Sequence, residues 1–172
     1  TRSDRPTDEE LDVAWRAVGA MQGRFLAHQN LNAENVHYAG ASTYVTGLDS
    51  GTVAAGDVVL RLDIAELLVT QALQTDVATA VAAARRVIGD GAVLRALPVL
   101  QRVALSKPTR TALGTDKSLL NEMRAELLTI NPTVDVEPID LERLKPRTVF
   151  TLILGTVAAY LLLSQLAQVN VQ

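Results

Sequence analysis

The chain has no cysteine, few aromatic residues and no excess of positive charge, and each shortage excludes a class of protein. Without cysteine it forms neither disulfides nor thiolate metal sites. Its 16 lysines and arginines against 19 aspartates and glutamates give a formal net charge of −3, so we expect no nucleic-acid partner. Aromatic residues make up only 3 % of the 172 residues, whereas hydrophobic residues make up 48 %. Alanine, leucine and valine therefore supply most of the apolar surface, which favours helices.

Charge is also missing after Arg147, where the rest of the sequence is uncharged. The predominantly apolar segment 148–170 predicts one transmembrane helix, because about twenty such residues, with about seventeen as the lower limit, cross a bilayer. Arg143, Lys145 and Arg147 precede it directly, so the positive-inside rule places the N-terminal part in the cytoplasm and the span in the plasma (inner) membrane. The alternative is a buried C-terminal helix of a soluble bundle.

Hydrophobic spacing predicts helices over most of residues 7–131. Thr7 and Glu10 form a capping box, and an amphipathic helix follows as far as Phe25. A second helix opens at Gly56-Asp57 and is apolar over most of its circumference, so we expect it to be buried. Further helices are expected from residue 75 to Ile88 before Gly89, from 92 to 105 with a bend at Pro98, and from Ser118 to Asn131.

Two short apolar segments, Val36–Tyr38 and Tyr44–Thr46, flank the turn Ala39-Gly40-Ala41-Ser42 and predict a β-hairpin. No strand is expected after Gly51. The predicted fold class is therefore mainly α with a small β-hairpin, and one transmembrane helix follows the helical region.

The residues around this hairpin carry the most specific motif. His28, Asn30, Leu31 and Asn35 stand at the spacing of the kinase catalytic loop H-R-D-L-x-x-x-N, and Asp49-Ser50-Gly51 stands where the D-F-G magnesium loop follows. The region resembles the C-lobe of a kinase-like fold. That resemblance implies a structural role for His28 and a magnesium ion shared by Asn35 and Asp49. It also implies that Asn30 stands in place of the aspartate that acts as the general base in a kinase. An amide accepts no proton near neutral pH, so Asn30 does not fill that role.

The same resemblance implies that Asp63, on the helix after the metal loop, steadies the catalytic loop. Two plainer interpretations stay open. The asparagines can be turn residues that bond their own backbone, and Asp63 can belong to a solvated surface with Arg61. No Gly-rich loop and no strand lysine precede Thr7, so this sequence lacks the phosphate cradle of a kinase.

A second resemblance covers Leu144–Thr148 and Leu161–Val169. These segments are similar to the junction in actinobacterial multi-pass proteins of the flippase-like, lysylphosphatidylglycerol-synthase transmembrane family. Some members carry a degenerate kinase-like region ahead of their first span. The implied domains are a kinase C-lobe-like cytoplasmic domain at 1–131, a linker and basic juxtamembrane segment at 132–147, and a transmembrane helix at 148–170. The implied role is moving, or helping to move, a lipid or lipid-linked envelope precursor.

Together these features predict a non-catalytic, pseudokinase-like module that regulates or scaffolds envelope-lipid transport. Its expected partners are the lipid bilayer and other membrane-protein subunits or downstream transmembrane helices. The sequence assigns no cofactor, and the kinase resemblance implies only weakly bound ATP with Mg²⁺. The alternatives are a part of a flippase-like transporter whose transport spans lie beyond this chain, and a weakly active phosphotransferase.

Overall fold

The computed structural model describes residues 5–39, 42–115 and 118–131, and all of these belong to one compact unit of the chain. The linker 132–147 with Arg143, Lys145 and Arg147, and the predicted transmembrane segment 148–170, lie outside the described residues. Within the described part, no helix is both long and apolar enough to cross a membrane.

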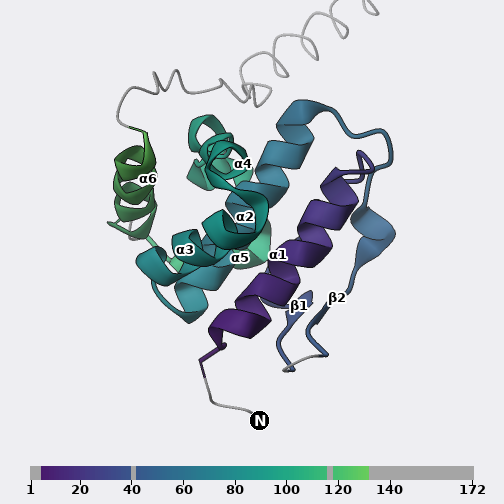
Figure 1. The fold of residues 1–172 in the computed structure, drawn as a ribbon, viewed down its shortest axis with the longest axis horizontal. Helices are drawn as coiled ribbons and strands as arrows, with labels where there is room; N and C mark the ends of the chain where they lie inside the picture. The colour runs from purple at the N-terminus through teal and green to yellow at the C-terminus, as the bar shows by residue number, and fades with distance from the viewer. Residues whose placement is uncertain (1–4, 40–41, 116–117, 132–172) are drawn as a thin grey trace, which may run out of the picture. The chain divides into compact units, whose positions relative to one another are not determined.

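Helices dominate the fold, and a single two-stranded sheet accompanies them in the described residues (Figure 1). Strand β1 (Val36–His37) pairs antiparallel with β2 (Tyr44–Val45), with Val36 opposite Val45. The predicted fold class, mainly α with a small hairpin, is confirmed at this level. The remaining elements are α1 (Asp8–Gln22), η1 (Leu48–Ser50), α2 (Asp57–Gln74), α3 (Val77–Ile88), α4 (Asp90–Leu94), η2 (Leu97–Val99), η3 (Arg102–Ala104), α5 (Lys107–Leu113) and α6 (Ser118–Ile130).

Helix α1 begins where the capping box predicts. The Thr7 hydroxyl accepts from the Glu10 N–H, and the Glu10 carboxylate accepts from the Thr7 N–H at 2.9 Å. Because Leu11, Trp15 and Val18 recur at helical spacing, they form one apolar face, and all three are fully buried.

Helix α2 is the central element, and it contacts α1, α3 and α5. Its residues Ile64, Leu67 and Leu68 are fully inaccessible to solvent, which confirms the predicted buried helix. The Trp15 indole N–H of α1 donates to the Gln71 side-chain oxygen of α2 at 2.8 Å, so the polar edge of the largest core side chain is satisfied.

Helices α3 and α6 match their predicted ranges, but the predicted single helix 92–105 is wrong. The structure has α4, η2 and η3 there, three short turns of helix. Pro98 lies in the first turn of η2, where its missing N–H costs no bond, and Gln101 is extended with φ −132° and ψ 145°, which ends the helical path. The next segment is helix α5, whose N-cap Ser106 side chain accepts from the Thr109 N–H.

The prediction that no strand follows Gly51 is confirmed within the described residues, although one isolated bridge lies just beyond that point. Ala27 and Thr52 form an isolated antiparallel bridge, with N–H···O distances of 3.0 and 2.9 Å. This bridge holds the segment after α1 beside the segment that leads into α2.

Candidate functional site

The candidate site is the loop from Gly23 to Asn35, which joins α1 to β1 and carries the kinase-like motif. Gln29 adopts a left-handed backbone, with φ +63°. Such a conformation costs free energy in a residue with a side chain, so neighbouring contacts must hold it.

Asp63 of α2 supplies two of those contacts. Its Oδ2 accepts from the His28 N–H at 2.6 Å, and its Oδ1 accepts from the Gln29 N–H at 2.7 Å. The carboxyl group is fully buried, which raises its pKa above the ordinary value of 3.8, and the two backbone N–H groups oppose that shift. These bonds are the contact that the sequence analysis expected of Asp63. The alternative, a solvated Arg61/Asp63 surface, is wrong, because Arg61 pairs instead with Asp57 and Asp63 has no exposure.

Thr70 of α2 binds the same loop at a second place, Leu31. Its hydroxyl donates to the Leu31 carbonyl at 2.8 Å, in a buried position. Residues 63 and 70 are seven apart and therefore share a face of α2. One helix face thus binds both N–H and C=O groups of the loop. Sequence analysis missed Thr70, although a polar residue at heptad distance from Asp63 in an apolar helix was an available signal.

His28 is buried and uses both ring nitrogens inside the protein. Its Nε2 lies 2.8 Å from the Thr46 carbonyl oxygen, and its Nδ1 accepts from the Asn30 N–H at 3.3 Å. Because a carbonyl only accepts, Nε2 carries a hydrogen and donates to it. The Thr46 carbonyl lies three residues before Asp49, so His28 connects the two motif segments.

Asn30 stands where the resemblance places the missing base, and its side chain is engaged locally. Its Oδ1 accepts from the Asn32 side-chain amide at 2.6 Å, and its backbone carbonyl accepts from the Asn35 side-chain amide at 2.9 Å. Asn32 in turn accepts from the Glu34 N–H at 2.8 Å. The side chains of Asn32 and Asn35 therefore bond the loop backbone, as the plainer interpretation expected, whereas that of Asn30 bonds the Asn32 side chain.

Asn35 faces the segment just before Asp49. The Thr46 N–H donates to the Asn35 carbonyl at 2.8 Å, and a Cβ added to Gly47 would lie 2.6 Å from the Asn35 side-chain oxygen. Gly47 has φ +78°, so glycine is required there both by conformation and by space. Asp49 follows on the exposed turn η1.

The two motif segments are also joined by Gln29, which occupies the position of the usual arginine. Its side-chain amide donates to the Ser50 carbonyl at 3.2 Å and to the Thr52 hydroxyl. The structure therefore brings His28, Asn30, Asn35 and Asp63 into one hydrogen-bonded unit. Among the residues that it describes, no group of three or more His, Cys, Asp or Glu side chains is arranged to hold a metal ion. The sharing of Mg²⁺ by Asn35 and Asp49 stays a prediction.

Glu66, one turn after Asp63, is a second buried carboxylate that sequence analysis missed. Its Oε2 accepts from the Ser106 N–H at 2.9 Å, and its Oε1 accepts from the Ser106 hydroxyl at 2.5 Å and from the Thr109 hydroxyl. It therefore binds the first turn of α5, where a helix dipole favours an anion. A cavity of about 170 Å³ lies between α2 and this turn and is lined by Asp63, Glu66 and Ser106 among others.

Comparisons of the chain with protein-family models, with curated proteins and with solved structures each found no match.

Proposed function

We propose that the chain is a non-catalytic, kinase-like cytoplasmic module of an integral membrane protein of the inner membrane. The observation that carries the proposal is the binding of one buried carboxylate, Asp63, to two consecutive backbone N–H groups of the His28–Asn35 loop. In a kinase-like C-lobe, an aspartate on the following helix holds the catalytic loop in this way. The loop is therefore maintained in a defined shape while Asn30 occupies the position of the proton acceptor.

The surrounding bonds favour a scaffold over an enzyme. The Asn30 side-chain oxygen is bound by Asn32, and both ring nitrogens of His28 are bound by backbone groups. General-base catalysis requires a group with a free lone pair and a suitable pKa. The proposed role of the loop is to present a fixed surface to a partner.

The membrane part of the proposal rests on the sequence of residues 148–170 and on the basic residues Arg143, Lys145 and Arg147. The partners are the bilayer and other membrane-protein subunits. We place the module in a machinery that transports an envelope lipid or a lipid-linked precursor, as the resemblance to flippase-like proteins implies.

Turnover of ATP by the full chain tests the catalytic part. With Mg²⁺ present, we expect no phosphate release above that of Asp49→Ala, which removes the proposed metal ligand. Release that Asp49→Ala abolishes would instead establish a weakly active phosphotransferase. Thermal unfolding with and without ATP and Mg²⁺ then separates a nucleotide-binding pseudokinase, whose unfolding temperature rises, from a scaffold, whose temperature is unchanged.

Alkaline carbonate extraction of membranes that contain the full chain tests the membrane part. A transmembrane chain stays in the pellet, and release of the chain into the supernatant would contradict the proposed span.

A further inference from the structure

Three apolar side chains project into solvent from the loops that flank the candidate site. Phe25 is 64 % exposed, Leu48 is 54 % exposed and Val53 is 75 % exposed, the three highest values among large apolar residues of the described chain. We call these three residues the loop patch. Tyr44 is nearly as exposed at 53 %, but its ring stacks on His37 with centroids 5.0 Å apart.

The residues of the loop patch come from neighbouring backbone segments although they are far apart in sequence. The Ala55 N–H donates to the Phe25 carbonyl at 2.8 Å, which sets Phe25 beside the segment of Val53. A Cβ on Gly51 would lie 2.9 Å from the Leu48 carbonyl oxygen and 3.1 Å from that of Ala27, so the turn of Leu48 reaches the same place.

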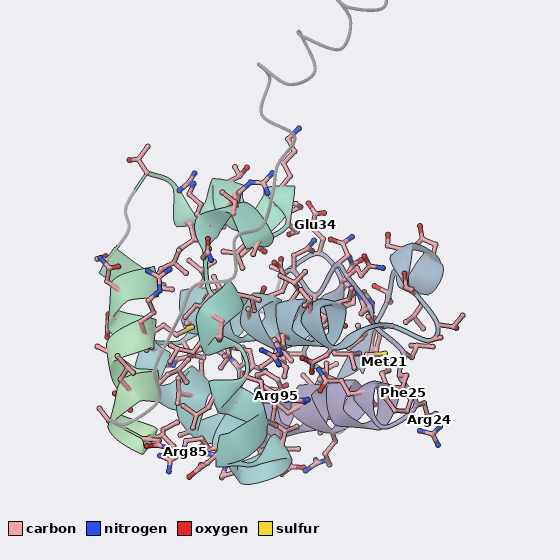
Figure 2. All side chains as sticks on the ribbon, turned by 90° about the horizontal axis from the view of Figure 1, so that it is seen from above. Met21, Arg24, Phe25, Glu34, Arg85 and Arg95 are labelled. Carbon is pink, nitrogen blue, oxygen red and sulfur yellow. The ribbon has the colours of Figure 1, made fainter. Side chains whose placement is uncertain are left out.

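The backbone holds the patch in its exposed position. Phe25 has a left-handed backbone with φ +55°, and so has Ala54, next to Val53, with φ +53°. Figure 2 shows Arg24 and Phe25 pointing outward at the end of α1, on the side of the domain opposite α6. Exposed apolar residues that gather on one surface indicate a contact with another molecule or with a membrane.

The length of chain between this domain and the proposed span favours a membrane as the occupant. Residues 132–147 are 16 residues, which span about 55 Å at most when fully extended. A connection of this length keeps the domain within about 55 Å of the proposed span, so its exposed apolar loops can reach the bilayer interface. Loop-borne single side chains are suited to a soft interface, into which each inserts separately.

Positive and negative charges near the loop patch are balanced, which indicates the kind of lipid surface that the patch would bind. Arg24 stands beside Phe25, and Asp49 stands beside Leu48. Asp57 is paired with Arg61 and Arg95. Attraction to anionic lipid is therefore weak, and burial of apolar side chains supplies the binding.

We infer that Phe25, Leu48 and Val53 insert into the membrane interface and set the orientation of the domain on the bilayer. This inference rests on the proposed function, because the span at 148–170 brings the domain to the membrane.

The absence of cysteine allows a direct test, since one introduced cysteine carries one fluorescent label. The full chain is reconstituted into phosphatidylcholine vesicles, with and without phosphatidylglycerol, that contain nitroxide-labelled lipid. The label is an environment-sensitive nitrobenzoxadiazole at Val53→Cys. The matched control is Val103→Cys on η3, a valine that is 43 % exposed. We expect lipid quenching and a blue shift at position 53 and neither at position 103, in both lipid mixtures.

Adding Phe25→Ser and Leu48→Ser should lower the quenching at position 53 to the level of position 103. Equal quenching at both positions, or quenching that survives the two serines, would overturn the inference. A blue shift without lipid quenching would also overturn it, because protein would then cover the patch. Carbonate extraction of the same vesicles distinguishes failure of this inference from failure of the proposed membrane span. A chain that stays anchored but unquenched overturns only this inference, whereas a chain that is released overturns the proposed span as well.

Discussion

Removing the Asp63 carboxylate should destabilise the domain more than any surface substitution. In Asp63→Ala, the N–H groups of His28 and Gln29 lose their acceptor. The His28 N–H is buried, and a buried donor without a partner carries its full desolvation cost, whereas the Gln29 N–H is only partly buried and loses less.

The expected magnitude follows from two opposing effects. A hydrogen bond to a charged group contributes about 1.5–3 kcal/mol, so two such bonds amount to about 3–6 kcal/mol. Burial of the carboxylate opposes this gain, as the raised pKa of Asp63 shows. We therefore expect the unfolding free energy to fall by about 2–4 kcal/mol, a large share of the roughly 5–15 kcal/mol typical of a domain. Asp63→Asn keeps one acceptor oxygen and should cost about half as much.

Urea unfolding of the full chain in detergent micelles measures this effect. Trp15 is the only tryptophan and lies fully buried between α1 and α2, so its fluorescence reports the relevant core. The matched control is Glu9→Gln, which breaks the exposed Glu9–Arg16 ion pair and should cost no more than about 1 kcal/mol. If Asp63→Ala and Glu9→Gln lower the unfolding free energy equally, the reasoning about Asp63 is wrong.

Three further predictions concern single residues. Gly47→Ala should lower the unfolding free energy by about 1–3 kcal/mol, because Gly47 has a left-handed backbone and the added Cβ would meet the Asn35 side-chain oxygen. The control is Gly91→Ala in α4, which has open space around it and should be neutral or stabilising. Because folding raises the pKa of Asp63, the contribution of Asp63 to the unfolding free energy is largest at acid pH and declines as pH rises through the folded pKa. The unfolding free energy of the wild type minus that of Asp63→Asn should therefore fall as pH rises from about 4. The Thr79 N–H lowers the pKa of the Asp76 cap, so the cost of Asp76→Ala, about 1 kcal/mol at neutral pH, should disappear as pH falls below about 4. A cost of Asp76→Ala that is independent of pH would contradict this assignment.

The parts of the fold that sequence predicts correctly are those with local causes. The Thr7 capping box and the end of α3 at Gly89 each depend on residues within one turn of one another. The buried helix α2 is recognisable because its apolar residues cover most of its circumference. The motif loop is recognisable because four residues, His28, Asn30, Leu31 and Asn35, keep a fixed spacing.

The parts that sequence analysis missed depend on contacts between distant segments. Glu66 binds Ser106 forty residues away, and Thr70 binds Leu31 thirty-nine residues away. The spacing of polar residues within an apolar helix does not indicate which distant residues they bind. The segment 92–105 was predicted as one helix because consecutive short turns have nearly the same apolar spacing as a bent helix, and only the extended backbone at Gln101 separates them.

Amide hydrogen exchange at His28 and Gln29, measured in the full chain, tests most directly whether α2 holds the loop. We predict strong protection of both amides in the wild type and its loss in Asp63→Ala under conditions in which α1 and α3 stay protected. Equal exchange of the two amides in wild type and Asp63→Ala would contradict the account.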